Sequence, residues 1–359
     1  MTVAPDTPLR PVLEWRKAGR ALIGAIAFGI GAARGSAQGA NYTVRDFKLA
    51  DGEVMPELRL HYRTLGPASG KAVLIMHGTS GSGDQFLAKV FAGELFGAGQ
   101  LLDTTKYYVI LPDDIGHGGS SKPSDGLHAK FPHYGYADMV EAEYRLVSDG
   151  LHVRHLRLVM GTSMGCMHSW MWLERYPTFM DGAVPLACMP TQISGRNRMW
   201  RRIAMDDIRL DPAWNGGEYT KPPFGYTAAM QVLSIMASSP LVLQKAGPTR
   251  DAADSAEIAM VQRRMATGDA NDLLYQLDAS RDYDPSPDLE RIVAPVLAIN
   301  SADDAINPPE LGIEEPLLER VKHVKFVLLP TTDQTRGHGT HTVAAVWKDY
   351  LAAFLATLP

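Results

Sequence analysis

The chain has 359 residues, of which 45% are hydrophobic and 21% charged, close to ordinary globular usage, and its length favours two domains. This composition excludes a disordered chain, a collagen and a polytopic membrane protein. With 35 basic and 40 acidic residues the net charge is −5, so the chain lacks the strongly basic character of a nucleic-acid-binding protein.

A basic and then apolar segment opens the chain. Basic residues at positions 10–20 precede an uncharged run at residues 21–33, which is too short to cross a bilayer of about 30 Å as a helix. This pattern is typical of a secretory signal peptide, here residues 1–37, with cleavage before Gln38. We therefore expect a periplasmic or secreted protein with no stable membrane insertion after cleavage. If the segment is not a signal, the protein is cytoplasmic.

Short apolar runs rich in β-branched residues then alternate with helical patterns. The first two runs flank the turn residues Asp51 and Gly52 and predict a hairpin. The later runs are typical of buried parallel strands, so the alternation predicts an α/β fold with a mostly parallel, doubly wound sheet. The predicted strands are residues 42–49, 58–64, 73–76, 107–111, 156–160, 183–187, 296–299 and 324–329, and the predicted helices include 136–149, 167–175 and 343–356.

Residues 191–285 interrupt this alternation with helical runs, including 227–238 and 255–267, and without a clear strand. We interpret them as a helical lid inserted between two parts of the core, residues 38–190 and 286–359. Apolar side chains of the lid are expected mainly to pack on the core, with about a third lining the substrate pocket. Arginines at its start form a solvated basic face or, alternatively, recognise a substrate carboxylate. The apolar residues are Trp200, Trp214, Phe224, Tyr226, Met230 and Met236, and the arginines are Arg196, Arg198, Arg201 and Arg202.

The motif Gly-Thr-Ser-Met-Gly at residues 161–165 lies between a predicted strand and a helical run. It matches the Gly-x-Ser-x-Gly nucleophile elbow, in which glycines allow a sharp turn that exposes the serine hydroxyl above the sheet edge. An ordinary strand-to-helix turn is the plain alternative, but the strand, motif and helix occur in the required order. We therefore predict that Ser163 is a nucleophile.

A serine nucleophile needs a histidine base that is oriented by a carboxylate. Asp304 follows the predicted strand at residues 296–299 and is our predicted acid, with neighbouring Asp303 as the alternative. His338 lies in a glycine-flanked loop after the last strand and is the predicted base. His341, three residues further on, is expected to cap the last helix or to support the base.

Backbone N–H groups must stabilise the negative charge that develops on the substrate oxygen. The residue after the nucleophile, Met164, is expected to supply one of them, and Thr79 in the loop after the third strand the other. That loop is rich in glycine and serine but lacks the Lys-Ser/Thr ending of a phosphate-binding loop. The turn at residues 113–120 (DDIGHGGS) follows the fourth strand and has either a structural role or a place beside the site.

Two cysteines, Cys166 and Cys188, cannot by themselves form a disulfide framework or a four-cysteine zinc site. We expect two buried free thiols, and export allows a disulfide between them as the alternative. The pair His338 and His341 lacks the glutamate that a zinc protease places between its histidines. No metal and no cofactor is therefore expected.

Residues 42–355 resemble an α/β-hydrolase and, more narrowly, the homoserine O-acetyltransferase branch of that family. The resemblance implies an α/β-hydrolase fold and places Ser163, Asp304 and His338 on the triad positions of the family. The stretches that carry the narrower resemblance are residues 102–110 (LDTTKYYVI), 161–167 (GTSMGCM), 209–219 (RLDPAWNGGEY) and 281–284 (RDYD).

Three features separate this chain from the transferases of that branch. Gly339 follows His338, where the transferases usually carry an aspartate; the turn at residues 113–120 is hydrolase-like; and an exported enzyme does not meet cytoplasmic acetyl-CoA. We therefore expect a serine hydrolase that cleaves an ester bond in a small-molecule substrate through an acyl-serine intermediate. An O-acyltransferase that moves an acetyl group from acetyl-CoA to a hydroxyl acceptor, and a non-catalytic binding protein, are the alternatives. The resemblance also allows a homodimer.

Overall fold

The computed structural model describes residues 37–359 except residue 267, so the predicted signal peptide lies outside the described residues apart from Ala37. The described residues form one eight-stranded sheet in the order β1-β2-β4-β3-β5-β6-β7-β8. Strands β1, β2 and β4 pair antiparallel and all other neighbours pair parallel. The strands are β1 (Gln38–Lys48), β2 (Val54–Leu65), β3 (Lys71–Met76), β4 (Tyr107–Pro112), β5 (Leu158–Thr162), β6 (Ala183–Leu186), β7 (Val296–Ser301) and β8 (Val324–Leu329).

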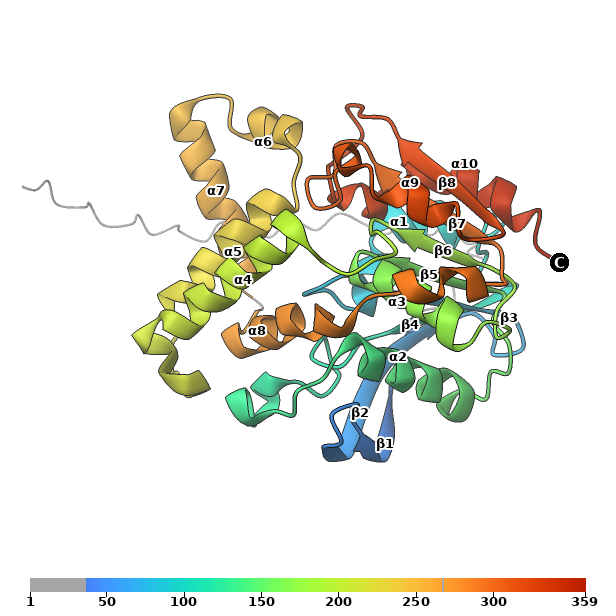
Figure 1. The fold of residues 1–359 in the computed structure, drawn as a ribbon, viewed down its shortest axis with the longest axis horizontal. Coiled ribbons are helices and arrows are strands. Elements are labelled where there is room, and N and C mark those ends of the chain that lie inside the picture. Colours follow the sequence, from blue (N-terminus) through green and yellow to red (C-terminus); the bar gives the residue numbers. More distant parts are fainter. Residues whose placement is uncertain (1–36, 267) are drawn as a thin grey trace, which may run out of the picture. The chain divides into compact units, whose positions relative to one another are not determined.

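Helices cover both faces of the sheet, which confirms the predicted α/β-hydrolase fold (Figure 1). The helices are α1 (Lys89–Leu95), α2 (Tyr136–Arg145), α3 (Met164–Arg175), α4 (Gly195–Leu210), α5 (Phe224–Met236), α6 (Pro240–Ala246), α7 (Arg250–Met265), α8 (Ala270–Asp278), α9 (Glu314–Leu318) and α10 (Ala344–Leu355). Short 3₁₀ segments lie at Gly83–Leu87, Pro123–Asp125, His128–Lys130, Pro212–Gly217, Ala279–Asp282, Ser286–Arg291, Pro309–Leu311 and Gly339–Thr342, and a π turn follows α2 at Leu146–Gly150.

The buried side chains of β3 alternate between two apolar clusters. Val73 and Ile75 belong to the cluster that contains α1 and α10 residues, whereas Leu74 and Met76 belong to the cluster that contains α2 and α3 residues. This alternation follows from the two-residue period of a strand, and burial on both faces explains why the central strands read as continuous apolar runs. Packing on both faces of the sheet therefore fixes the carboxyl ends of these strands.

Several element boundaries differ from the predicted ones. Strand β1 begins at Gln38 rather than at residue 42, because its exposed first residues pair with β2 and carry no alternating apolar pattern. Leu156 forms only an isolated bridge with Met180, so β5 begins later than predicted and continues to the elbow. Helix α3 begins at Met164, directly after the elbow serine.

The segment predicted as a lid contains helices α4 to α8, between β6 and β7. Two residues of α8 tie it to the core. Gln276 accepts a hydrogen bond from Ser80 Oγ at 2.9 Å and donates one to the Gly116 carbonyl at 2.7 Å. Asp272 accepts hydrogen bonds from the backbone N–H and the hydroxyl of Ser124 at 2.8 and 2.7 Å. The lid is thereby joined to the loops that follow β3 and β4.

The described residues include no single helix that is both long and apolar enough to cross a membrane. Helices α5 and α6 satisfy the length and composition test together, but they are bent by 111° at their break.

Replacing Glu174 on α3 with glutamine should stabilise the protein at alkaline pH. Burial, followed by the charges of Asp288 and Asp284, raises the pKa of Glu174 to about 8, and its Oε1 has no hydrogen-bond partner. A carboxyl group whose pKa is higher in the folded than in the unfolded protein destabilises the fold when it ionises. The full cost applies above the folded-state pKa, and it disappears as the pH falls toward the unfolded-state pKa of about 4.3.

The free energy of unfolding of the variant should therefore exceed that of the wild type by about 1–3 kcal/mol at roughly pH 9, and the gain should shrink toward about pH 5. Urea unfolding at both pH values measures this difference. Glu319→Gln, which changes an exposed side chain, is the control. An equal gain in the free energy of unfolding at both pH values would contradict the raised pKa of Glu174.

Candidate active site

Ser163 occupies a strained turn between β5 and α3. Its backbone φ and ψ angles are 56° and −108°, a region that non-glycine residues rarely adopt, and its N–H donates to the Leu186 carbonyl at 2.9 Å. A Cβ atom at Gly165 would collide with the Met76 carbonyl oxygen, and one at Gly161 with the Gly165 carbonyl oxygen. Both glycines are therefore required by close backbone contacts, as the elbow motif predicts.

The structure brings Ser163, His338 and Asp304 together from three separate loops. The Ser163 hydroxyl lies 2.7 Å from His338 Nε2, and His338 Nδ1 lies 2.8 Å from Asp304 Oδ2. Asp304 and His338 are buried, whereas Ser163 is partly accessible. This is the hydrogen-bonded order in which a histidine can take a proton from serine while a carboxylate fixes its orientation.

The environment of Asp304 favours its charged form. Burial acts to raise the pKa of Asp304, but the His338 imidazole and the hydrogen bonds from Ile306 and Asn307 outweigh it and hold the pKa below its usual value. Backbone N–H groups of Ile306 and Asn307 donate to Oδ1 at 2.7 and 3.2 Å. The carboxylate therefore stays ionised next to the imidazole.

Asp303, the alternative acid, has different partners. It accepts hydrogen bonds from the hydroxyls of Ser301 and Thr335 at 2.5 and 3.0 Å and from the Gly337 N–H at 2.9 Å. Asp303 thus holds the loop that carries His338, while Asp304 contacts the imidazole itself. His341 packs beside His338 with ring centroids 5.3 Å apart, and burial lowers the pKa of His341 to about 3.

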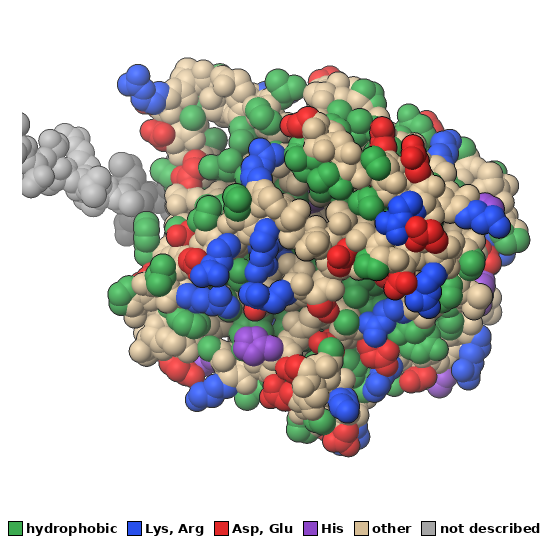
Figure 2. Space-filling model, in the orientation of Figure 1, with side chains coloured by type: hydrophobic (Ala, Val, Ile, Leu, Met, Phe, Trp, Pro, Cys, Tyr) green, Lys and Arg blue, Asp and Glu red, His purple; other side chains and the backbone are tan. Residues whose placement is uncertain are grey.

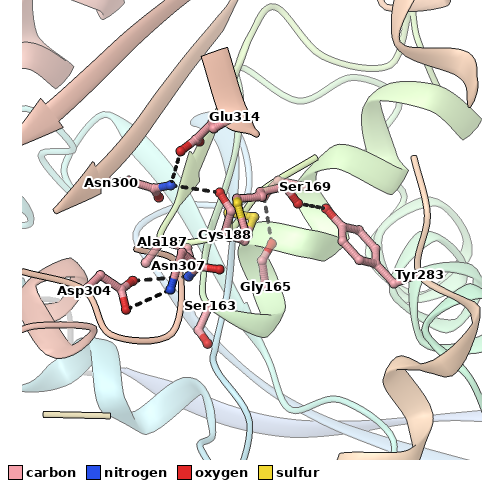
Figure 3. Close-up of a disulfide and its surroundings, with 12 residues drawn as sticks. Ser163, Gly165, Ser169, Ala187, Cys188, Tyr283, Asn300, Asp304, Asn307 and Glu314 are labelled. Atoms are coloured by element: carbon pink, nitrogen blue, oxygen red, sulfur yellow. Dashed lines mark hydrogen bonds between the residues drawn. A yellow bond between two sulfur atoms is a disulfide. The ribbon is translucent and has the colours of Figure 1, made fainter. Parts of the chain in front are cut away.

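Asn307 is a site residue that the sequence analysis missed. Its side-chain Nδ2 donates to Asp304 Oδ2 at 3.1 Å and to the Ala187 carbonyl at 3.0 Å (Figure 3). It therefore joins the Asp304 carboxylate to the chain that follows β6. An asparagine three residues after the acid has no distinctive sequence signal, so only the folded chain identifies it.

The loop after β3 lies directly beside Ser163. A Cβ atom at Gly78 would lie 3.2 Å from Ser163 Cβ and 3.8 Å from its Oγ. The Gly165 N–H donates to the His77 carbonyl at 2.9 Å, whereas the N–H groups of Thr79 and Met164 donate to no group within the described residues. These two N–H groups are therefore free to bind a substrate oxygen.

The turn at residues 113–120 has structural contacts. Asp113 accepts hydrogen bonds from the Gly83 and Gly119 N–H groups at 2.7 and 2.8 Å, and the Ser120 hydroxyl donates to the Asp113 carbonyl at 2.6 Å. Asp113 thereby joins this turn to the loop after β3. Through this hydrogen bond the turn holds the end of the loop that lies next to Ser163.

Asp114, Glu143 and His168 form a buried cluster with ligand atoms that all lie within 4.8 Å of one another, a donor set that suits a divalent cation. They come from three separate elements, so sequence spacing could not reveal them. Burial raises the pKa of Glu143 to about 7, and burial with the neighbouring Glu143 raises the pKa of Asp114 well above normal. Burial also lowers the pKa of His168, whose Nδ1 lies 2.9 Å from Glu143. Within the described residues, His168 Nδ1 and Trp172 Nε1 lie 2.9 and 2.6 Å from the Glu143 carboxylate, whereas neither carboxylate oxygen of Asp114 has a hydrogen-bond partner.

Cys166 and Cys188 form a disulfide, so the expectation of two free thiols was wrong (Figure 3). The pairing follows from the sheet. Thr162 at the end of β5 pairs with Leu186 at the end of β6, and each cysteine lies just beyond one of these strand ends. The disulfide therefore joins α3, the helix after Ser163, to the chain that continues into the lid.

Replacing both cysteines with alanine should lower the free energy of unfolding by about 3 kcal/mol, because the disulfide closes a loop with a sequence separation of 22 residues. Urea unfolding of the wild type and of the double variant measures the change. Alkylation of the denatured, unreduced wild type should detect no free thiol. Two alkylated cysteines in that sample would contradict the disulfide.

A cavity of about 260 Å³ opens beside Ser163 and His338. The chain after β6, the start of α4 and residues 306–313 supply most of its lining, which is mainly apolar. None of the six apolar lid residues named in the sequence analysis lines this cavity, contrary to the expected third. Trp200 packs in the core, Phe224 is 76% exposed, and Tyr226 and Met230 line a second cavity of about 520 Å³ between the lid and the loop after β3.

Comparison with known proteins places this geometry in a family. Residues 71–328 match the family model described as the alpha/beta hydrolase fold. The chain is 31% identical over 199 residues to a homoserine O-acetyltransferase of Chloroherpeton thalassium, a match that covers half of each chain. Among solved structures it resembles homoserine O-acetyltransferase from Bacillus anthracis, with a TM-score of 0.79, 20% identity and coverage of 90% of this chain and 98% of that one.

The fold is equally similar to that of a hydrolytic enzyme. Esterase E22 superimposes with a TM-score of 0.78 and 19% identity, covering 89% of this chain and all of that one. At these identities the two solved structures support the fold and leave the acyl acceptor open. A homoserine O-acetyltransferase of Trichormus variabilis is 30% identical over 294 residues, covering 73% of this chain and 79% of that one. The chain therefore belongs to the alpha/beta-hydrolase family, in its homoserine O-acetyltransferase-like branch.

Proposed function

We propose that the protein is a serine hydrolase that cleaves an ester-type bond in a small-molecule substrate through an acyl-Ser163 intermediate. The observation that carries this proposal is the hydrogen-bonded chain Ser163–His338–Asp304 at the wall of a small, mostly apolar cavity. A serine hydroxyl paired with an oriented histidine is the arrangement that nucleophilic acyl transfer needs.

In the first half of the reaction, His338 Nε2 accepts the Ser163 hydroxyl proton while Oγ attacks the ester carbonyl carbon. The N–H groups of Met164 and Thr79 bind the oxygen that becomes negative, and Asp304 stabilises the imidazolium through Nδ1. The bond to the alcohol oxygen then breaks, and Nε2 gives its proton to that oxygen. An acyl-Ser163 ester and a free alcohol result.

In the second half, water replaces the alcohol. His338 Nε2 takes a proton from water as the water oxygen attacks the acyl carbon, and the bond to Ser163 Oγ breaks as Oγ regains that proton. A carboxylic acid leaves and the enzyme is restored. An acyltransferase would use a hydroxyl acceptor in place of water, so the two activities share every step up to acylation.

The residue after His338 supports water as the acceptor. A Cβ atom at Gly339 would have its nearest neighbour, Arg336 Cβ, at 3.8 Å, so the backbone leaves room for a side chain there. The transferases of this branch usually carry an aspartate at this position, and Gly339 offers no carboxylate there for an amino-acid acceptor. Transfer to a hydroxyl acceptor is the second candidate, and it is favoured by the homoserine O-acetyltransferase relative.

The acceptor can be identified by following the acyl group. The chain from Gln38 is incubated with p-nitrophenyl acetate, with and without L-homoserine, and with Ser163→Ala as the control. Free acetate as the main product in both mixtures, lost in the control, is the expected result. O-acetylhomoserine as the main product would overturn the hydrolase proposal in favour of the transferase. Ligand binding without turnover would indicate a binding protein.

We also propose that the protein is exported to the periplasm or secreted, with residues 1–37 as the signal peptide. The Cys166–Cys188 disulfide supports this, because disulfides persist in oxidising compartments. Expression of the full chain in a Gram-negative bacterium, followed by fractionation and N-terminal sequencing, tests the proposal. A mature chain that begins near Gln38 outside the cytoplasm is expected, and an uncleaved cytoplasmic chain would contradict it.

A further inference from the structure

Arg201 on α4 is buried in the wall of the cavity that contains Ser163 and His338. Its side chain and backbone are together only 3% exposed, yet the residue lines this cavity. Arginine is almost never fully buried unless an anion or a carboxylate pairs with it. The partners of Arg201 are therefore informative.

The partners of the Arg201 guanidinium within the described residues are neutral. Nε donates to Asn197 Oδ1 at 3.1 Å, and Nη1 lies 3.4 Å from the Ser280 hydroxyl. Among the described residues, no carboxylate lies within 4.0 Å of the guanidinium. Its other neighbours are also uncharged: the Trp200 ring, whose centroid lies 5.0 Å from Arg201 Cζ, and the buried Tyr136 phenol. Burial of a cation without a counter-ion carries a desolvation penalty, so the folded protein is stabilised when an anion binds beside it.

The other arginines of α4 do not share this environment. Lys and Arg side chains gather on the surface over the lid helices (Figure 2). Arg202 is exposed and pairs with Asp206, and the exposed Arg196 donates to the Ala305 carbonyl. Glu310 also lines the cavity, but it is exposed to solvent and forms no ion pair with Arg201. Arg201 alone among the α4 arginines combines burial with a place in this cavity.

We propose that Arg201 binds a carboxylate carried by the substrate, so that the enzyme prefers small esters with a second, anionic group. This inference rests on the proposed hydrolase function and names its substrate class. The cavity of about 260 Å³ suits a small molecule, and Met167, Ile193 and Ile306 line it with apolar surface. An ester separated from a carboxylate by a short aliphatic chain satisfies both the apolar lining and the buried guanidinium.

Matched substrates test this preference. Mono-p-nitrophenyl succinate is compared with neutral p-nitrophenyl butyrate, which places the charge in the acyl part. The second pair is 3-acetoxybutyrate and its neutral analogue, methyl 3-acetoxybutyrate. In this pair the charge lies in the alcohol part of the acetyl ester. In at least one pair, the wild type should have a kcat/KM about tenfold or more higher for the anionic member, with most of the difference in KM.

Arg201→Met should abolish that preference, and Arg201→Lys should retain part of it because the positive charge remains. Arg202→Met removes a neighbouring exposed charge and should leave the preference unchanged. Because Arg201 has no carboxylate partner, Arg201→Met should also unfold at a temperature equal to or above that of the wild type. A clearly lower unfolding temperature would indicate a structural role and would overturn the proposal.

Binding without turnover separates this proposal from the hydrolase proposal. Calorimetry with the Ser163→Ala protein should show that mono-p-nitrophenyl succinate binds about tenfold or more tightly than p-nitrophenyl butyrate, or that the acetoxy acid exceeds its methyl ester in the same way. The Ser163→Ala/Arg201→Met protein should lose the difference. Equal affinity for the charged and neutral members of both pairs would overturn the carboxylate site, even if ester hydrolysis is confirmed.

Discussion

Replacing Ser163 with alanine should lower kcat for ester hydrolysis by about 10⁴-fold or more, because the variant lacks the atom that forms the acyl intermediate. The fold should remain, since alanine keeps the Cβ and the Ser163 side chain forms its hydrogen bond with His338 alone within the described residues. Steady-state kinetics with p-nitrophenyl acetate, together with thermal unfolding, measure both effects.

Ser169→Ala is the matched control for this variant. Ser169 lies on α3, the helix that begins directly after Ser163, and its hydroxyl donates to the Gly165 carbonyl at 2.8 Å. Its replacement should change kcat by only a few-fold, an effect within the cost of one ordinary hydrogen bond of about 1 kcal/mol. Full activity of Ser163→Ala would show that another group attacks the substrate, and the triad assignment would be wrong.

Replacing Asp304 with asparagine should lower kcat by about 10⁴-fold, because an amide cannot hold the imidazole with Nδ1 protonated or stabilise its cation. The same change at Asp303 should have a much smaller effect on kcat, since Asp303 contacts Ser301, Thr335 and the Gly337 N–H. Without the Asp303 carboxylate, the loop that carries His338 loses these hydrogen bonds, so the main effect should be a lower free energy of unfolding.

Kinetics and urea unfolding of both variants separate the two roles. Asp304→Asn is expected to lose activity at an unfolding midpoint close to that of the wild type, and Asp303→Asn to show the reverse. If Asp303→Asn proved to be the inactive variant and Asp304→Asn retained activity, the acid would have to be reassigned.

Much of the site could be predicted because its chemistry is encoded locally. The nucleophile elbow needs glycines at fixed positions, and the structure shows the backbone contacts that require Gly161 and Gly165. Asp304 and His338 each follow a strand with a clear apolar pattern, and the carboxyl ends of parallel strands meet at one sheet edge. The structure places these residues in the predicted order, within hydrogen-bond distance of one another.

The features that the sequence did not reveal depend on contacts between distant segments. The disulfide depends on the pairing of β5 with β6, and Asn307 acts through the Ala187 carbonyl, 120 residues away in the sequence. The division of the α4 arginines into exposed and buried members depends on how the helix packs. Apolar lid residues gave a wrong expectation for the same reason, since hydrophobicity does not distinguish a core contact from a cavity wall.

Covalent labelling of the nucleophile tests the central claim most directly. The wild type is treated with a fluorophosphonate, which transfers its phosphonyl group to an activated serine, and the labelled protein is analysed by intact-mass measurement and peptide mapping. One phosphonyl group per chain, located on Ser163, with ester hydrolysis lost in proportion to labelling, is the predicted result. Hydrolysis that survives complete labelling of Ser163, or a label on a different residue that alone abolishes activity, would contradict an acyl-Ser163 mechanism.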